Sequence, residues 1–236
     1  MSRDDLAARR GVETAVYQPA EDSALLARAA VETIAENDRV LEVGTGSGWV
    51  AARVASETGA SVVASDLNPH ACRQARERAR TPRTGTEGDG SVEGGGDGDD
   101  EHRDSGEDEH RLAGEGTPGF DVVTADLVSA FADGSFDCVL FNPPYLPTDP
   151  DNEWDDWMER ALSGGESGRA VIEPFLDTVE RVLAPGGRVL LLVSSLAGYE
   201  TVLDHARDRG FSVEKAVEES YPFETLTVVS MRVDRD

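Results

Sequence analysis

Four consecutive residues, Asn142-Pro143-Pro144-Tyr145, are the part of this sequence whose side chains could most directly do chemistry. Each proline fixes its own φ and lacks an N–H, and Pro144 also excludes Pro143 from the helical region, so the turn is stiff. Such a turn can hold the Asn142 side-chain oxygen and the Pro143 carbonyl as two acceptors around one point. They suit a planar NH₂ group, whose lone pair would then be aimed, and Tyr145 offers a ring for stacking. Taken alone, the segment is about equally compatible with a turn that ends a strand.

A glycine-rich loop, Gly44-Thr45-Gly46-Ser47-Gly48, follows an apolar run and precedes a predicted helix. Glycines at alternate positions let a ligand approach the backbone closely. The spacing differs from the Gly-x-Gly-x-x-Gly of dinucleotide-binding folds, and no Gly-Lys-Ser/Thr follows that would bind a triphosphate. Glu42, just before the loop, would repel a pyrophosphate but could hold an ammonium group.

Acidic residues also end two further predicted strands. Asp66 could accept hydrogen bonds from both hydroxyls of a ribose. Asp126 could accept from the exocyclic amine of adenine, while Leu127 covers the face of the ring. Either acid alone would be interpreted as a helix cap. Together with Glu42 and the glycines, they indicate a ligand with an ammonium group, a ribose and an adenine but no phosphate, which is S-adenosylmethionine.

The elements that must position these residues alternate between strands and helices. We expect strands at 39–44, 61–66, 120–126, 136–141 and 188–195, helices at about 19–36, 47–57, 69–80, 167–183 and 198–209, and a closing hairpin at 211–221 and 224–233. This order predicts an α/β fold with a doubly wound, mostly parallel seven-stranded sheet and an antiparallel C-terminal strand. In such sheets ligands bind beyond the carboxyl ends of the strands, where the motifs above fall.

The composition is strongly acidic. The 236 residues carry a formal charge of −25, and Lys215 is the only lysine among 22 basic residues. Such a composition resembles that of proteins from halophilic archaea, because at molar salt the Debye length is only ~3 Å and self-repulsion is screened. We find no basic stripe of the kind that binds nucleic acid, which argues against a DNA or RNA substrate.

We expect one α/β domain over residues 1–236, interrupted by a disordered acidic insertion at 83–116. The insertion is rich in glycine and holds twelve acidic residues but almost no large apolar ones, so it cannot offset the entropy of ordering. Cys72 and Cys138 are the only cysteines and read as free thiols, with no metal site. We find no signal peptide and no apolar stretch long enough to span a bilayer, and we expect a cytoplasmic protein.

The motifs together resemble a known family. The loop from Glu42 to Gly48, Asp66, Asp126-Leu127 and the Asn142–Tyr145 turn are similar to class I methyltransferases that act on a planar nitrogen. Three further segments resemble the archaeal and eukaryotic HemK-like branch, namely Tyr17-Gln18-Pro19-Ala20-Glu21-Asp22-Ser23, Gly164-Gly165-Glu166-Ser167-Gly168-Arg169 and Glu224-Thr225-Leu226. That branch methylates the glutamine of the Gly-Gly-Gln loop in class I peptide-chain release factors, and the likeness fails only over the first sixteen residues and the insertion.

The resemblance implies a role for individual residues. The cofactor would be bound by Ser23, Glu42, Gly44, Gly46, Asp66, Asp126, Leu127 and Asn142. The substrate would be bound by Asn142, Pro143, Pro144, Tyr145, Gly164 and Gly165, with Asn142, Pro143 and Tyr145 as the catalytic residues. The sequence departs from the family at Gln18, where Glu is usual, and in the long insertion.

The resemblance also implies a partner, because relatives bind a small zinc-binding activator protein that adds a strand to the sheet. The strand at 120–125 is apolar for an exposed edge and would accept such a strand in a heterodimer. The alternative is that the acidic insertion covers this edge.

Three other functions fit part of the pattern. The Asn-Pro-Pro-Tyr turn would suit adenine N6 or guanine N2 of a nucleic acid as well as a glutamine amide. A cofactor-binding module without catalysis is disfavoured by the retained turn, and a dehydrogenase is disfavoured by Glu42.

Overall fold

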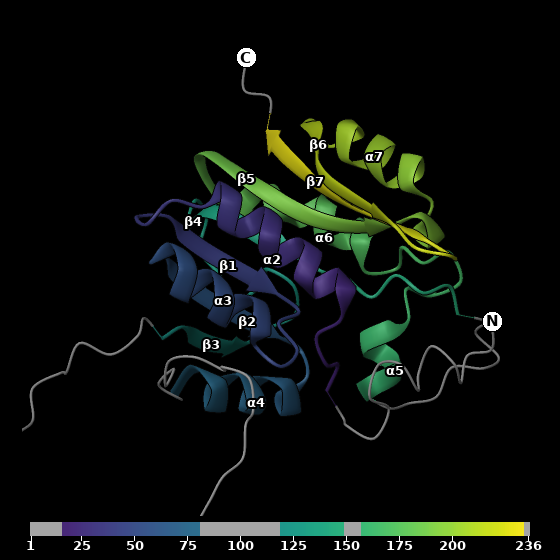
Figure 1. The fold of residues 1–236 in the computed structure, drawn as a ribbon. Helices are drawn as coiled ribbons and strands as arrows, with labels where there is room; N and C mark the ends of the chain where they lie inside the picture. Colours follow the sequence, from purple (N-terminus) through teal and green to yellow (C-terminus); the bar gives the residue numbers. More distant parts are fainter. Residues whose placement is uncertain (1–15, 81–118, 149–156, 234–236) are drawn as a thin grey trace, which may run out of the picture.

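The computed structural model describes residues 16–80, 119–148 and 157–233. Seven strands form one sheet in the order β3-β2-β1-β4-β5-β7-β6 (Figure 1). The strands are β1 Arg39–Val43, β2 Ser61–Asp66, β3 Asp121–Thr124, β4 Phe136–Phe141, β5 Leu183–Ser194, β6 Phe211–Ser220 and β7 Thr225–Val233. The first five pair in parallel, whereas β7 runs antiparallel to β5 and β6. The predicted doubly wound sheet with an antiparallel C-terminal strand is confirmed.

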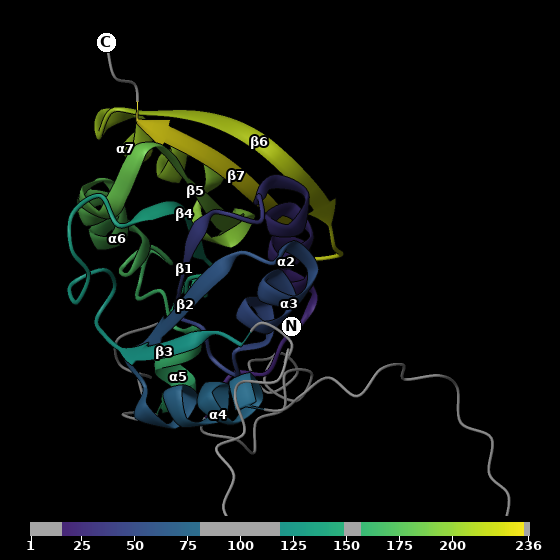
Figure 2. The same cartoon turned by 90° about the vertical axis from the view of Figure 1, so that its left-hand side faces the viewer.

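Helices cover both faces of this sheet, and Figure 2 shows α2 and α3 on one side and α6 and α7 on the other. The helices are α2 Glu21–Thr33, α3 Trp49–Thr58, α4 Pro69–Arg80, α5 Trp157–Leu162, α6 Ile172–Thr178 and α7 Tyr199–Asp208, with 3₁₀ turns η2 Val179–Val182 and η3 Ser195–Ala197. Because both faces are covered, the central strands are apolar on both sides, which is why β4 and β5 read as continuous hydrophobic runs.

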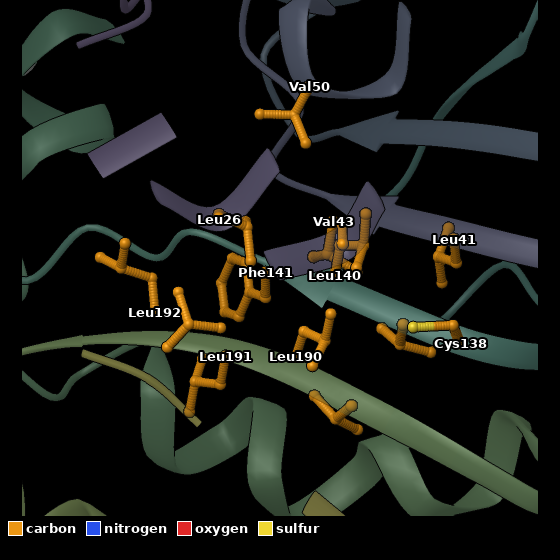
Figure 3. Packing of buried hydrophobic residues seen from close by; sticks show 14 of the residues in the cluster. Leu26, Leu41, Val43, Val50, Cys138, Leu140, Phe141, Leu190, Leu191 and Leu192 are labelled. Atoms are coloured by element: carbon orange, nitrogen blue, oxygen red, sulfur yellow. The ribbon is translucent and has the colours of Figure 1, made fainter. Parts of the chain in front are cut away.

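The core lies between these layers, and Figure 3 shows its packing around β1, β4 and β5. Leu41, Leu140 and Leu190 are fully buried. The rings of Phe141 and Phe175 meet with centroids 4.5 Å apart. Because Phe141 is the last residue of β4, this packing anchors the strand at the point where the Asn142 turn leaves it.

Most predicted elements are confirmed within a few residues, and strands 61–66 and 136–141 have the predicted bounds. The long helix predicted at 167–183 is confirmed only from residue 172 on, as α6 and η2, and its predicted start is wrong. Gly168 has a φ of 74°, and a Cβ there would stand 2.7 Å from the Tyr145 carbonyl oxygen, so this segment is a tight turn. Helix α6 therefore starts only at Ile172, and β5 already begins at Leu183, before the predicted Arg188.

Helix α5 was not predicted, because its six residues are too few to show a helical period and follow an acidic stretch. The predicted insertion at 83–116 lies outside the described residues, so the extent of the domain and its interruption stay predictions. In the part that is described, Cys72 and Cys138 are buried free thiols, no helix could cross a membrane, and no three acidic, His or Cys side chains are grouped to hold a metal ion.

Candidate active site

A cavity of about 240 Å³ lies at the carboxyl ends of β1, β2 and β4. Its lining residues are spread along the chain from Tyr17 to Val171. Eleven predicted site residues line it: Ser23, Glu42, Gly44, Gly46, Asp66, Asp126, Leu127, Asn142, Pro143, Pro144 and Tyr145. The sheet thus brings together the two halves of the predicted site, because β1 and β4 are neighbours although a hundred residues separate their ends.

The glycine-rich loop forms one wall of this cavity. Gly44 and Gly46 have φ values of 66° and 54°, which residues with a Cβ rarely adopt. A Cβ on Gly44 would lie 3.3 Å from the Phe141 ring. The loop is fastened to the next strand, since the Gly46 N–H donates to Asp66 Oδ2 (2.8 Å). The loop backbone is therefore fixed in position, and at Gly44 and Gly46 no Cβ separates it from the cavity.

Glu42 lies below the loop with only 4 % of its surface exposed. Its Oε2 accepts hydrogen bonds from the Thr45 hydroxyl (2.6 Å) and the Ala51 N–H (2.9 Å). Burial raises the pKa of Glu42 to about 8, against the lowering effect of these two hydrogen bonds. A buried carboxyl group of this kind favours a cation beside it, because an ammonium group would stabilise the ionised form.

Asp66 is the last residue of β2, and Asp126 lies two residues after the end of β3. Asp66 accepts from the N–H groups of Gly46 and Asn68, and burial raises the pKa of Asp66. The Leu67 N–H also hydrogen-bonds to this carboxylate, and with three of its four acceptor positions used, one is left for a hydroxyl donor. Leu127 has a φ of 46° and is the only residue other than glycine in the described chain with a left-handed backbone. Backbone strain of this kind occurs most often at functional sites, where the surrounding structure holds the residue in place.

The Asn142 turn closes the other wall of the cavity. The side-chain oxygen Oδ1 of Asn142 is buried, and among the described side chains it is the one buried polar atom without a hydrogen-bond partner. An acceptor left in this state costs roughly 1–3 kcal/mol, so a donor brought by a ligand would relieve the cost. Tyr145 is 3 % exposed, and its hydroxyl donates to Asp22 Oδ2 (3.4 Å).

Asp22 was not predicted as a site residue. It is 2 % exposed, in the first turn of α2, and it also lines the cavity. The Tyr17 hydroxyl donates to the same Oδ2 (2.7 Å), and the Ser23 N–H donates to Oδ1 (2.6 Å). This carboxylate therefore ties both tyrosines to the start of α2. The helix dipole also favours an acidic residue in the first turn of a helix, so the sequence alone did not reveal that Asp22 contacts the two tyrosines.

Gly164 and Gly165, predicted near the substrate, do not line the cavity. The Gly164 N–H donates to the Leu146 carbonyl (2.9 Å), and the Thr148 N–H donates to the Gly165 carbonyl (2.9 Å). A Cβ on Gly164 would stand 2.5 Å from the Gly168 backbone. These glycines thus brace the chain that follows the turn. Trp157 and Arg160 of α5 line the cavity instead, and no sequence signal indicated them.

The sequence of this chain is similar to those of known methyltransferases. A domain profile described as a methyltransferase domain matches residues 40–89. A Methanocaldococcus jannaschii protein assigned as a protein N5-glutamine methyltransferase, MJ0928, is 31 % identical over 215 residues, covering 91 % of this chain and 90 % of the relative. The human methyltransferase HEMK2 is 29 % identical over 228 residues, 93 % of this chain and 91 % of HEMK2.

Solved structures share the fold. The E. cuniculi Mtq2-Trm112 complex, described as responsible for methylating the translation termination factor eRF1, contains a chain that superposes with a TM-score of 0.64. That match has 24 % sequence identity and covers 94 % of this chain and all of the other.

Proposed function

Because this chain belongs to the HemK-like family of protein glutamine methyltransferases, we propose that it methylates N5 of the glutamine in the Gly-Gly-Gln loop of a class I peptide-chain release factor. The observation that carries this proposal is the unpartnered Oδ1 of Asn142 in the wall of the cavity. The M. jannaschii relative is named for glutamine N5 methylation, and the E. cuniculi complex for methylation of eRF1. Since the M. jannaschii and human relatives match over nine-tenths of their length, we assign the chain to the archaeal and eukaryotic branch.

The lining residues fit S-adenosylmethionine, which when bound supplies an electrophilic methyl group on a sulfonium. The buried Glu42 would hold the ammonium group of its methionine part, and Asp66 its ribose hydroxyls. Asp126 and Leu127 would hold the adenine. The open backbone at Gly44 and Gly46 leaves room for the ligand, and Ser23 and Asn142 would complete the contacts.

The substrate amide would be held by the turn. The Asn142 and Pro143 oxygens accept one hydrogen each from the glutamine NH₂, Pro144 keeps the turn stiff, and Tyr145 stacks on the amide plane. The lone pair of an amide nitrogen is delocalised into its carbonyl, so orientation toward the methyl group is the main contribution of these residues. The two oxygens also stabilise the positive charge that develops on nitrogen, before a proton leaves to solvent. Gly164 and Gly165 would support the entering Gly-Gly segment indirectly, through the chain that follows the turn.

Among the described residues that line the cavity, we find no candidate base near the turn other than the carboxyl groups already described. A catalytic base is not needed for this reaction, because the methylated amide nitrogen is strongly acidic until it loses a proton. The reaction therefore depends mainly on how the amide is oriented toward the methyl group, which agrees with a site built from prolines, glycines and buried hydrogen bonds.

The partner would be a small zinc-binding activator subunit that joins the sheet at β3. This strand is at the edge of the sheet and pairs only with β2 within the described residues. Val122 and Val123 are half-buried there, so a partner strand could cover apolar surface as well as backbone groups. Co-expression with the activator should raise solubility and give a heterodimer in sizing experiments, whereas an active, soluble monomer would contradict this part of the proposal.

We further propose adaptation to high salt, on the basis of the −25 charge and the single lysine. We also propose a cytoplasmic location, because the two cysteines are free thiols, as is usual in a reducing compartment. A second candidate substrate is an exocyclic amine of a nucleic-acid base, which presents the same NH₂ plane to the Asn142 turn. The acidic composition disfavours it, because phosphate binding depends on clustered basic residues.

The test is transfer of a radiolabelled methyl group from S-adenosylmethionine, using enzyme co-expressed with the activator. Three acceptors are compared at molar salt: a recombinant archaeal release factor, its Gly-Gly-Gln loop variant with Gln→Ala, and bulk nucleic acid. We expect label only in the unmodified factor. Label in the Gln→Ala factor would move the modification to another residue, and label in the nucleic acid would favour the second candidate.

A further inference from the structure

Three large hydrophobic side chains are exposed in the described part of the chain: Leu67 (52 %), Leu196 (39 %) and Phe223 (63 %). Leu67 lines the cavity. Leu196, in η3, and Phe223, between β6 and β7, have no such explanation. We call these two residues, with the exposed Pro222, the apolar tip. The segments that carry Leu196 and Phe223 are joined by hydrogen bonds, so the two exposed side chains belong to neighbouring parts of the surface, and exposed apolar groups gathered in this way are typical of a contact surface.

The apolar tip is held rigidly. The Tyr221 N–H donates to the Glu224 carbonyl (2.7 Å), so only Pro222 and Phe223 span the turn. Turns this tight usually carry Asn or Gly, and a large aromatic residue gains nothing there for the fold. The turn is fastened to η3, because the Thr225 N–H donates to Ser195 Oγ (3.0 Å).

A second contact between the same two segments runs from the Ser194 hydroxyl to Glu224 Oε2 (2.8 Å). Leu196 and Phe223 therefore belong to segments that cannot move independently. An aromatic side chain presented on a rigid turn loses little entropy on binding, which is a property of anchor residues in protein interfaces.

The apolar tip borders the rim of the active site on one side through η3. The carbonyl of Ala197 accepts from Arg169 Nη1 (2.8 Å). Gly168 is packed between the Tyr145 carbonyl and Ala197, as a Cβ on it would lie 2.7 Å from the one and 3.1 Å from the other. The segment at Gly168 therefore lies directly between Tyr145 and η3.

The same turn approaches the start of α2 on the other side. Arg28 of α2 pairs with Glu219 of β6 (2.7 Å), and the Tyr221 hydroxyl donates to Glu219 (2.7 Å). Burial, this hydrogen bond and the charges of Glu219 and Glu21 raise the pKa of Tyr221 to about 12. Figure 1 shows the β6–β7 turn at the end of the sheet where α2 begins.

Two exposed carboxylates stand near this rim, Glu21 at the start of α2 and Glu166 in the loop before Gly168. Neither has an ionic partner among the described residues. A surface that fits here would therefore combine an apolar side chain with basic neighbours.

We propose that the apolar tip is the docking site for the part of the release factor that flanks its Gly-Gly-Gln loop. The inference rests on the proposed function. The cavity must hold the cofactor as well as the glutamine side chain, so the remainder of a folded factor must lie over the rim. Apart from Leu67, which lines the cavity itself, Leu196 and Phe223 are the large hydrophobic side chains exposed in the described part of the chain.

The test compares an intact release factor with a short Gly-Gly-Gln peptide as methyl acceptors. In the variant Phe223→Ser with Leu196→Ser, we expect kcat/KM for the intact factor to fall about 10-fold or more, mainly through KM. The peptide, which cannot reach the apolar tip, should be methylated as before. Binding of the intact factor to the enzyme, measured by fluorescence anisotropy without turnover, should weaken by the same factor.

Two controls accompany this variant. Phe223→Leu keeps an apolar anchor and should retain most of the affinity. Ala132→Ser changes an exposed residue before β4, at the opposite end of the strands, and should have no effect. Equal losses for factor and peptide, or unchanged binding of the intact factor, would overturn the docking site while leaving the proposed function standing. If the unmodified enzyme labels neither acceptor, the proposed function fails, and the docking site fails with it.

Discussion

Replacing Asn142 with alanine should separate the stability of this protein from its activity. Oδ1 of Asn142 is buried without a hydrogen-bond partner, a state that costs roughly 1–3 kcal/mol. The substitution removes this cost and loses only the small packing contribution of the amide. We therefore expect the free energy of unfolding to stay unchanged or to rise by up to about 2 kcal/mol. Turnover should fall by on the order of 100-fold, about 2.7 kcal/mol of transition-state stabilisation.

Asn68→Ala is the matched control for stability. Asn68 is buried too, but its Oδ1 accepts from the His70 N–H (2.9 Å) at the start of α4, so the same substitution removes a satisfied cap. It should lower the free energy of unfolding by about 1 kcal/mol. Denaturant unfolding of both variants and methyl transfer by Asn142→Ala give the comparison. If Asn142→Ala is as destabilised as Asn68→Ala and turns over normally, the Asn142 oxygen is a structural group and the reasoning fails.

Three further predictions follow from other parts of the site. Burial raises the pKa of Glu42 to about 8, so the protonated carboxyl group contributes stability to the folded protein. This contribution is fully present below about pH 4.5 and is lost as the pH rises through about 8. The Glu42→Gln variant has no carboxyl group to ionise there, so its Tm should increase relative to that of the unmodified protein as the pH rises across this range. Curves of Tm against pH that run parallel for the two proteins would contradict this prediction. Gly48→Ala should lower stability by several kcal/mol and Gly134→Ala by only about 1–2 kcal/mol. Both have left-handed φ values, but a Cβ at Gly48 would stand 2.9 Å from a neighbouring side chain and one at Gly134 would meet nothing within 4 Å, so equal losses in urea unfolding would count against the packing argument. Asp22→Asn and Tyr145→Phe should each lower kcat, and if Asp22 acts by positioning Tyr145, the double variant should lose little more than the worse single one; fully additive losses would refute that role.

The sequence was sufficient for the fold because its signals were strong and local. A polar residue of the site lies at or next to the last residue of each of β1, β2 and β4, and parallel strands bring their carboxyl ends to one edge. That geometry alone assembled Glu42, Asp66 and Asn142 around one cavity. It could do so without knowledge of packing, because strand order and direction decide where a strand ends.

What the sequence could not predict depends on contacts between distant segments. Asp22 looks like an ordinary first-turn acid until the structure shows Tyr17 and Tyr145 donating to it. The wrong start of the helix predicted at 167–183 has the same origin, since the turn at Gly168 is set by the Tyr145 carbonyl and by η3. The contribution of α5 to the cavity is also a tertiary effect, because six residues carry no periodic signal.

The most direct test of the central claim is a crystal structure of the enzyme with S-adenosylhomocysteine and a glutamine-containing peptide from the release-factor loop. The account predicts the glutamine NH₂ within hydrogen-bonding distance, about 2.9 Å, of both Asn142 Oδ1 and the Pro143 carbonyl oxygen. A peptide bound with its amide outside the turn, or an adenosyl group bound away from Glu42 and Asp66, would contradict it.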